Sequence, residues 1–236
     1  MKNKLIFIIF YIYYMWILPF FILIAGFFNK KVYNYDYYLK YLNKYLNYEI
    51  NYVKEEERIE KGFIFSNHRS WADFPIDYLI TNYVACGRYL AGFAMGFITI
   101  LLFRDNNIIL FNRGTANRKS VYQLCKNKLS YKDIILIYPE GTRMNYQYLE
   151  SKDDIKNKLK KGLIKEIYER NEFPIQLQIT SNKEKVVNEK KLEINHNITL
   201  NCAISKSIHP KDYSTFEDFL DKISEEWYQL WRMTHL

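Results

Sequence analysis

The chain has 236 residues, of which 49% are hydrophobic and 25% charged, and its formal net charge at pH 7 is +8. This length allows one compact domain with a hydrophobic core beside a membrane segment, and the basic balance suits anionic lipid surfaces, nucleic acid or phosphorylated ligands. The three cysteines, Cys86, Cys125 and Cys202, are scattered and form no C-x-x-C pair, which argues against a disulfide framework and against a zinc site.

The chain begins with a long apolar segment. Residues 5–28 contain no charged side chain, and as a helix they would measure about 36 Å, enough to cross the hydrocarbon core of a bilayer. Pro19 predicts either a kink in that helix or a hairpin that dips into one leaflet. A cleaved signal peptide is the alternative, but its apolar region is normally about 7–15 residues long. We therefore predict an uncleaved membrane anchor, helix or hairpin, over residues 1–31.

A second amphipathic segment follows the anchor. Tyrosine and leucine recur at helical spacing over residues 35–46, which predicts a helix with one apolar face. That face either lies at the level of the lipid headgroups or packs against the core of the protein. Because a charged loop over residues 54–61 comes next, residues 32–61 are interpreted as an interfacial helix and a connecting segment.

The remaining residues, 62–236, alternate short apolar runs with helical patterns and contain no internal repeat. This alternation predicts an α/β domain with a mixed sheet flanked by helices. Residues 89–103 are uncharged but too short to span a bilayer, so they form buried core, a re-entrant piece or the wall of an acyl-chain groove. The predicted strands are 63–65, 108–111, 134–138, 173–180 and 192–204, and the predicted helices are 72–82, 115–129, 151–171 and 214–231.

Two short motifs each follow directly after an apolar run. The first, NHRSWAD, begins at Asn67 and places His68 and Asp73 in an H-x4-D spacing. The second, YPEGTR, runs from Tyr138 to Arg143. Either motif alone is weak, because H-x4-D recurs by chance and Pro-Glu-Gly-Thr-Arg reads equally as a turn with a surface ion pair. Together, in this order and behind an apolar segment, they indicate a functional site.

The residue types fit acyl transfer from a thioester to an alcohol, which needs a base for the hydroxyl proton and donors for the oxyanion. Histidine titrates near neutrality and suits the base, and a carboxylate on its far ring nitrogen fixes its tautomer. On a continuous helix, residues five apart are about 140° apart around the axis and would not meet. We therefore predict that His68 lies in a strand-to-helix turn and that Asp73 reaches back from the first turn of the helix.

Other chemistries fit these residues less well. Ser66 and Ser70 flank the histidine, but the G-x-S-x-G elbow of a covalent serine hydrolase is missing. The four histidines are too dispersed for a metal site, and no P-loop or dinucleotide glycine pattern occurs. The basic run over residues 156–165 is interpreted as a solvated helix face, with the 3′-phosphate of CoA or an anionic headgroup as the alternative. Nucleic acid is not expected as a partner, because the same chain carries a membrane segment.

The two motifs resemble the signature of the glycerolipid acyltransferase family, which transfers fatty acyl groups from a thioester to glycerophospholipid hydroxyls. The resemblance implies that His68 is the catalytic base and that Asp73 orients it. Arginine binds phosphate bidentately and glycine lets the backbone approach a ligand closely, so both residue types fit an acceptor site. The residues that the resemblance assigns to acceptor binding are Arg113, Glu140, Gly141, Thr142 and Arg143.

The sequence departs from the family pattern at three positions. Asn107 stands where the family usually has glycine and Leu110 where it usually has an aromatic residue, so the block that ends in Arg113 rests mainly on that arginine. A further block is similar over residues 160–163 and 173–177, but Leu177 stands where the family usually has a second proline. This last departure affects inferences about the acyl pocket and leaves those about the base unchanged.

The resemblance implies an O-acyltransferase that moves a fatty acyl chain from acyl-CoA to the free hydroxyl of a lysophospholipid. The expected acceptor is 1-acyl-glycerol-3-phosphate and the expected product is phosphatidic acid. Acyl-CoA would be a co-substrate, and no further cofactor or metal is expected. The alternatives are another lysophospholipid acceptor, a CoA-independent transacylase, a non-catalytic membrane-anchored lipid-binding protein, or a lipid hydrolase that uses Ser70. The protein is expected in the endoplasmic reticulum or another intracellular membrane, with its catalytic domain on the cytosolic side.

Overall fold

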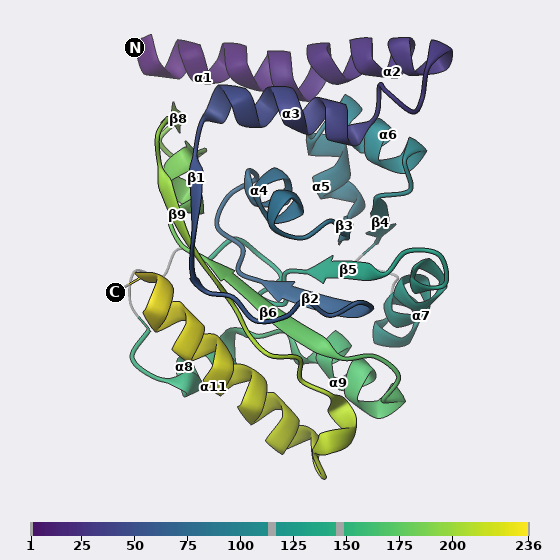
Figure 1. Cartoon of the computed structure of the whole chain (residues 1–236), viewed down its shortest axis with the longest axis vertical. Helices are drawn as coiled ribbons and strands as arrows, with labels where there is room; N and C mark the ends of the chain where they lie inside the picture. Colours follow the sequence, from purple (N-terminus) through teal and green to yellow (C-terminus); the bar gives the residue numbers. More distant parts are fainter. Residues whose placement is uncertain (1, 113–116, 145–148, 236) are drawn as a thin grey trace.

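The structure, a computed structural model, describes residues 2–112, 117–144 and 149–235 (Figure 1). The polypeptide starts as one long helix made of α1 (Lys2–Ile12), a π-helical turn (Tyr13–Ile17) and α2 (Leu18–Phe28). Pro19 lies in the first turn of α2, directly after the π-helical turn. A proline ring lacks the backbone donor and clashes with the preceding turn, and the wider π-helical turn makes room for it. The chain therefore continues as a helix, and the hairpin predicted as an alternative at Pro19 is wrong.

The N-terminal helix lies lengthwise against the rest of the protein (Figure 1). Its buried residues recur at intervals of about one helical turn from Phe7 to Gly26, so they share one face along its length. The other side exposes large apolar side chains, among them Phe21, Phe27 and Phe28. Within the described residues, this helix alone is long and apolar enough to cross a membrane, over Asn3–Phe28. The folded chain therefore covers one side of the helix and leaves the other side apolar and open.

The next helix, α3 (Tyr35–Leu46), packs beneath the N-terminal helix (Figure 1). Asn34 caps its first turn by accepting a hydrogen bond from the N–H of Tyr37 at 3.0 Å, and Asn47 ends it in the left-handed conformation with φ 48°. Its apolar stripe is buried in the hydrophobic core, so the core face, of the two sequence alternatives, is the one that forms. The buried members of this stripe are Tyr35, Tyr38, Leu39, Leu42 and Leu46.

A seven-stranded sheet with the order β1-β9-β6-β2-β5-β3-β4 forms the centre of the protein. Neighbouring strands are parallel except β6 and β9, which are antiparallel. The central strands β2, β5 and β6 are buried on both faces. The sequences of β2 and β5 accordingly read as short apolar runs, whereas β6 alternates apolar residues with the buried Gln176 and Gln178. The strands are β1 (Glu49–Lys54), β2 (Gly62–Ser66), β3 (Val84–Arg88), β4 (Ile108–Phe111), β5 (Ile134–Ile137), β6 (Ile175–Thr180) and β9 (Thr199–Ile204).

Helices cover both faces of the sheet (Figure 1), so the predicted α/β fold with a mixed sheet is confirmed. One hydrophobic cluster joins a face of the sheet to α3, α4, α6 and the N-terminal helix. A second cluster joins the opposite face to α7, α8, α9 and α11. The bounds of these helices are α4 (Asp73–Ile80), α5 (Tyr89–Ala94), α6 (Phe97–Arg104), α7 (Arg118–Leu129), α8 (Lys152–Lys158), α9 (Lys161–Arg170), α10 (Lys183–Val186) and α11 (Phe216–His235), with a short 3-10 turn at Pro210–Asp212.

Two predicted elements are interrupted. The strand predicted over residues 192–204 divides, because Asn197 takes a positive φ of 57° and β9 begins only at Thr199. Its first part forms β8 (Glu193–Ile194), which pairs with β7 (Val187–Asn188) in a separate small sheet. The helix predicted over residues 151–171 divides into α8 and α9, and at the break the N–H of Lys160 donates to the carbonyl of Pro139 at 2.8 Å. This hydrogen bond connects the segment between α8 and α9 to the second motif.

Two further segments differ from simple sequence patterns. The edge strand β1 was not predicted, because it is mostly exposed and carries no apolar run. The uncharged residues 89–103 form most of two short helices, α5 and α6, with Gly96 between them at φ 60°. A positive φ is favourable only for glycine-like backbones, so the change of direction between the two helices depends on Gly96.

Trp227 on α11 is fully buried in the second hydrophobic cluster. We expect Trp227→Ala to lower the free energy of unfolding by about 3–5 kcal/mol, because it removes apolar burial and leaves a cavity. Met233 lies on the same helix with 49% of its surface exposed, and Met233→Ala should change the free energy of unfolding by at most ~0.5 kcal/mol. Denaturant unfolding of both variants in detergent measures the difference, and equal stabilities would contradict this core.

Candidate active site

The two sequence motifs lie side by side at one edge of the sheet. His68 follows β2 and Glu140 follows β5, and these two strands are adjacent and parallel. The carboxyl ends of parallel strands meet at the same edge, where open α/β sheets place their ligand sites. The topology therefore brings together two motifs that are far apart in the sequence.

His68 and Asp73 meet in the turn between β2 and α4. The Nδ1 atom of His68 lies 2.7 Å from Oδ2 of Asp73, which is the first residue of α4. The same carboxylate accepts hydrogen bonds from the backbone N–H of Arg69 at 2.5 Å and of Ser70 at 3.0 Å. The backbone thus folds around the carboxylate, in the strand-to-helix geometry that the H-x4-D spacing requires.

The charge state of Asp73 follows from its surroundings. Burial acts to raise the pKa of this fully buried carboxyl, but the Lys183 ammonium, His68 and the N–H of Arg69 outweigh burial and hold the pKa below its ordinary value. A carboxylate at Nδ1 favours the tautomer that carries its hydrogen on that nitrogen. The Nε2 atom of His68 is then free to accept a proton, and the side chain is 18% exposed.

Aromatic packing fixes the orientation of the imidazole ring. The His68 ring stacks on Tyr138 with 4.5 Å between centroids and 18° between planes. Phe74 contacts both rings edge-on, at 6.2 Å from His68 and 5.3 Å from Tyr138. The Tyr138 hydroxyl is itself held by a hydrogen bond to Asp77 at 2.8 Å. The ring of His68 is therefore fixed on its face, its edge and its Nδ1 atom.

The second motif holds the backbone of the first. Glu140, only 1% exposed, accepts a hydrogen bond from the N–H of His68 at 2.9 Å. On the other side, the N–H of Met144 donates to the carbonyl of His68 at 2.9 Å. Gly141, between them, takes a φ of 71°, which its missing side chain allows. Glu140 thus contacts the turn that carries His68.

The other residues assigned to acceptor binding lie further out. Thr142 is exposed. Arg143, 51% exposed, forms an ion pair with Glu189, whose carboxylate also accepts a hydrogen bond from the N–H of Trp71 at 2.8 Å. Arg113 lies outside the described residues. The structure therefore places Glu140 and Gly141 against the His68 turn and Arg143 at the surface beside it.

Sequence reasoning missed Arg88, a basic residue of this region. Arg88 ends β3, the strand beside β5, and its Nη2 atom donates to the carbonyl of Gly141 at 2.7 Å. The guanidinium therefore lies against the loop of the second motif. Its signal in the sequence is a single arginine after a short apolar strand, and only the order of the strands in the sheet distinguishes it from other surface arginines.

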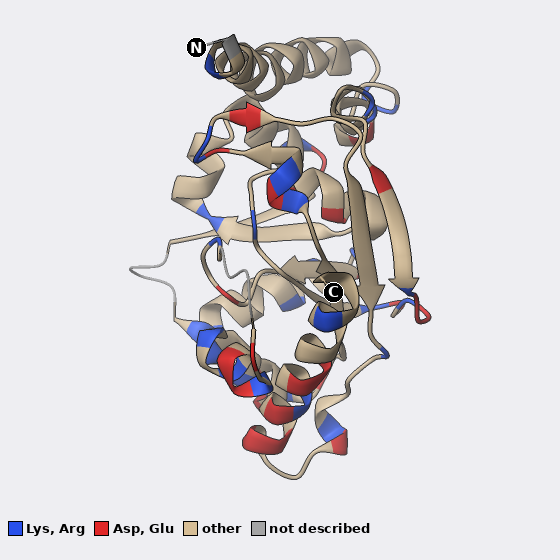
Figure 2. Cartoon of the chain, turned by 90° about the vertical axis from the view of Figure 1, so that its left-hand side faces the viewer, with Lys and Arg blue, Asp and Glu red and all other residues tan. Residues whose placement is uncertain are grey.

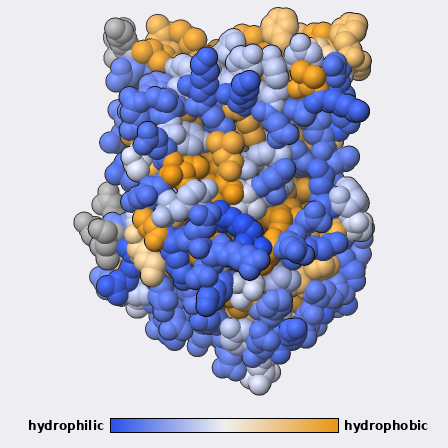
Figure 3. All heavy atoms as spheres, in the orientation of Figure 1, coloured by the Kyte–Doolittle hydropathy of each residue, from blue (hydrophilic) through white to orange (hydrophobic). Residues whose placement is uncertain are grey.

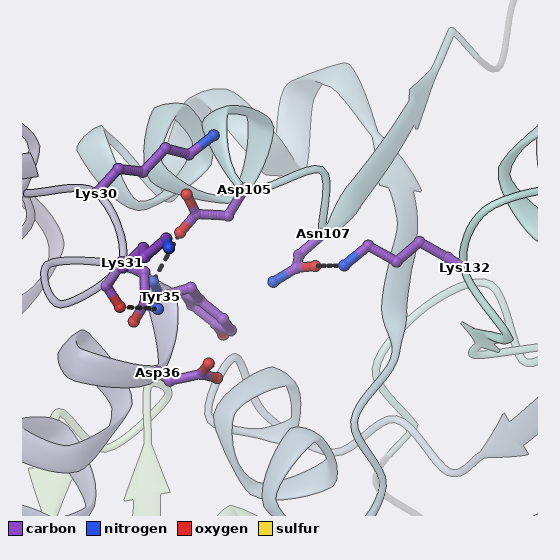
Figure 4. A pocket seen from close by; sticks show the side chains of 8 residues that line it. Lys30, Lys31, Tyr35, Asp36, Asp105, Asn107 and Lys132 are labelled. Carbon is purple, nitrogen blue, oxygen red and sulfur yellow. Dashed lines mark hydrogen bonds between the residues drawn. The ribbon is translucent and has the colours of Figure 1, made fainter.

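A cavity of about 510 Å³ lies away from these motifs (Figure 4). It is bordered by Asn107 and Lys132, which precede β4 and β5 and so mark the amino ends of the strands, whereas the motifs follow the carboxyl ends. Lys132 Nζ donates to Oδ1 of Asn107 at 3.1 Å, and Lys30 Nζ donates to the carbonyl of Arg104 at 3.1 Å. This cavity is therefore separate from the candidate active site.

In the described part of the chain, no group of three or more His, Cys, Asp and Glu side chains is placed to hold a metal ion.

Charge and hydropathy divide the molecule into two ends. Lys, Arg, Asp and Glu gather on α8, α9 and α11, whereas the N-terminal helix carries almost none of them (Figure 2). The face seen in Figure 3 has apolar atoms along the N-terminal helix and a mainly hydrophilic surface at the opposite end. The molecule thus presents one apolar end and one charged end.

Comparison with known proteins gives the family. Residues 49–175, more than half of the chain, match the family model described as Acyltransferase. The crystal structure of the 1-acyl-sn-glycerophosphate (LPA) acyltransferase PlsC from Thermotoga maritima is similar in fold, with a TM-score of 0.67 over 99% of this chain and 94% of that chain at 18% sequence identity. No curated protein sequence matches the chain. The resemblance predicted from the two motifs is thereby confirmed, and the chain belongs to the acyltransferase family.

Proposed function

We propose that the protein is a lysophospholipid acyltransferase in which His68 is the general base. The observation that carries this proposal is the 2.7 Å contact between His68 Nδ1 and the buried Asp73, in a turn held by Glu140. In the proposed reaction, Nε2 of His68 takes the proton of the acceptor hydroxyl, and the hydroxyl oxygen attacks the thioester carbonyl. The carbon–sulfur bond then breaks, the thiol sulfur leaves, and the imidazolium returns its proton to that sulfur. This route requires no covalent enzyme intermediate.

We further propose acyl-CoA as donor and 1-acyl-glycerol-3-phosphate as acceptor. A phosphate beside the His68–Asp73 dyad needs cationic donors. Among the described residues, Arg143 lies in the loop of the second motif and Arg88 ends the neighbouring strand β3. Arg143 would exchange its ion pair with Glu189 for the phosphate of the substrate. The similar structure is named for a 1-acyl-sn-glycerophosphate acyltransferase, which supports the same acceptor here.

We propose that the N-terminal helix lies in the plane of a membrane. Because the folded chain covers one face of this helix along its length, the helix is better suited to lie in the interface than to cross the bilayer alone. On α5, Leu90 and Phe93 are each 81% exposed and extend the apolar surface. The three free cysteines fit a reducing compartment, so we place the catalytic domain on the cytosolic side of the endoplasmic reticulum or another intracellular membrane.

The proposed phosphate contact of Arg88 has a kinetic consequence. Arg88→Met should raise the KM for 1-acyl-glycerol-3-phosphate by roughly 10- to 100-fold, the size expected for losing a charged hydrogen bond. The KM for acyl-CoA should stay within about twofold, because the variant changes the acceptor side alone. Arg88→Lys keeps the charge but loses the planar fork, so its KM for 1-acyl-glycerol-3-phosphate should lie between those of the wild type and Arg88→Met. Steady-state kinetics measure all three proteins, and an unchanged acceptor KM in Arg88→Met would rule out this contact.

The proposed function is tested with purified protein in liposomes and a panel of acceptors and donors. Labelled oleoyl-CoA with 1-acyl-glycerol-3-phosphate should give labelled phosphatidic acid. A different labelled phospholipid would keep the reaction and change the acceptor. Transfer from a phospholipid donor alone would indicate a CoA-independent transacylase, and release of free fatty acid would indicate a hydrolase. No product from any pair would favour a non-catalytic lipid-binding protein.

A further inference from the structure

A buried lysine lies directly behind the His68–Asp73 pair. Lys183, at the start of α10, is fully buried. Its Nζ atom lies 3.0 Å from Oδ2 of Asp77 and 3.9 Å from Oδ1 of Asp73. It also donates to the carbonyl of Asn67 at 2.5 Å, one residue before His68. One ammonium therefore contacts both carboxylates and the backbone of the catalytic turn.

The second carboxylate that Lys183 contacts is Asp77, one helical turn after Asp73 on α4. Together with His68, these three residues form a cluster of titratable groups. It is fully buried and accepts hydrogen bonds from Ser66 Oγ at 3.1 Å, Tyr138 Oη at 2.8 Å and Gln178 Nε2 at 3.1 Å. Burial raises the pKa of Asp77, whereas the Lys183 ammonium acts to lower it. A second buried carboxylate beside His68 and Asp73 destabilises the fold unless a cation balances its charge. Lys183 is that cation.

The net formal charge of the cluster changes from negative to zero during the proposed reaction. With His68 neutral, Asp73, Asp77 and Lys183 carry two negative charges and one positive charge. When His68 accepts the substrate proton, the four groups become neutral together. Without Lys183 the resting cluster would hold two uncompensated buried negative charges, which favour the protonated imidazole of His68. His68 would then hold its own proton to higher pH and would be less available as a base.

We propose that Lys183 is a positioning residue for acyl transfer, whose ammonium balances Asp77 so that Asp73 faces His68 as a carboxylate. The inference rests on the proposed function, in which His68 is the base. The contact with the carbonyl of Asn67 gives the lysine a second role, because it holds the start of the catalytic turn. Lys183 does not touch the reacting atoms and acts through its neighbours.

Other titratable groups surround the cluster and enter its pH response. Tyr138 lies under the Lys183 ammonium, 5.6 Å from Nζ to its ring centroid. Burial and the two aspartates raise the pKa of both Tyr83 and Tyr138, so these phenols stay neutral as the imidazole titrates. Among the described residues, Tyr48, Cys202 and His235 also interact electrostatically with Asp77, Lys183 or Arg69. Glu140 contacts the backbone of His68.

The test compares Lys183→Met, Asp77→Asn and the double variant with a matched control. Lys185 lies on the same short helix but is exposed, so Lys185→Met removes the same charge away from the cluster. Two readouts are used: the pH profile of kcat/KM for acyl transfer from oleoyl-CoA to 1-acyl-glycerol-3-phosphate, and the ring ¹⁵N NMR titration of His68 in detergent without substrates. The His68 signal is assigned by its loss in His68→Ala.

Lys183→Met should lower kcat/KM by roughly 10- to 100-fold, the size seen when the outer partner of a functional histidine is lost. Removing a positive charge makes the cluster bind protons more readily, so the His68 midpoint and the acidic limb should move to higher pH, on the order of one unit. Asp77→Asn removes a negative charge and should move both to lower pH. The double variant should return the midpoint toward that of the wild type, and Lys185→Met should leave it unchanged.

Opposite shifts in the two single variants would support the proposal, because a lysine needed only for folding would not move the midpoint in a charge-dependent direction. A folded Lys183→Met protein with a wild-type midpoint would overturn it. If Lys183→Met does not fold, Asp77→Asn decides, and an unchanged midpoint there would overturn the proposal as well. The NMR titration needs no substrate, so a wild-type protein without acyl transfer would overturn the proposed function and leave this test intact.

Discussion

His68→Ala is expected to lower kcat/KM for acyl transfer by roughly 10²–10⁴-fold, the usual contribution of a positioned general base. The variant removes the proton acceptor, while Asp73 keeps its hydrogen bonds from Arg69 and Ser70. Folding and lipid binding should therefore survive. Liposome flotation and thermal unfolding check both properties, and initial rates with acyl-CoA and 1-acyl-glycerol-3-phosphate give the activity.

The matched control for this variant is His196→Ala. His196 is exposed and packs edge-on against Tyr45, with 5.1 Å between ring centroids, outside the dyad. We expect its activity to stay within about twofold of the wild type, as for a surface substitution. A folded, membrane-bound His68→Ala protein with full activity would remove His68 from the mechanism.

Asp73→Asn is expected to lower kcat by up to about 10⁴-fold, the loss seen for the corresponding change in the Ser-His-Asp arrangement. Asparagine keeps the shape of Asp73 but neither favours the Nδ1–H tautomer of His68 nor stabilises the imidazolium. Rapid-quench measurements of the acyl-transfer step give kcat, and ring ¹⁵N NMR reports the tautomer. A wild-type rate in Asp73→Asn would mean that the carboxylate has no part in orienting the base.

The lowered pKa of Asp73 also predicts a pH dependence of stability. A carboxyl whose pKa is lower in the folded than in the unfolded chain stabilises the fold above its unfolded value, about 3.9. That stabilisation is lost as the pH falls through the folded value, which the Lys183 ammonium and the Arg69 N–H depress despite burial. Asp73→Asn should therefore flatten the decrease of stability below about pH 4.

The sequence was sufficient for the parts of the site that depend on local geometry. Because His68 and Asp73 are five residues apart, they can meet only across a strand-to-helix turn, and the apolar run before Asn67 indicated that turn. The alternation of apolar runs with helical patterns likewise predicted the mixed α/β sheet, because strands buried on both faces, such as β2 and β5, are largely apolar. These inferences needed only neighbouring residues.

Other features depend on contacts between distant segments and left little local signal. Lys183 stands in a polar stretch, Ser181-Asn-Lys-Glu-Lys185, that reads as a surface turn. Lys183 is buried because α10 packs beside α4, where its ammonium contacts the carboxylates of Asp77 and Asp73. Arg88 likewise becomes part of the region only because β3 lies beside β5. The N-terminal helix is similar, since hydropathy gives its length but only the packing of Phe7 to Gly26 shows which face the protein covers.

The central claim is that the protein transfers an acyl group from acyl-CoA to a lysophospholipid hydroxyl, with His68 as the general base. The most direct test incubates wild type and His68→Ala, matched for folding and membrane binding, with ¹⁴C-labelled oleoyl-CoA and 1-acyl-glycerol-3-phosphate in liposomes, and identifies the labelled lipid by chromatography and mass spectrometry. We expect labelled phosphatidic acid from the wild type, with free CoA released in equal amount, and almost none from the variant. Equal product from both proteins, or no labelled phospholipid from the wild type with any acceptor, would contradict the claim.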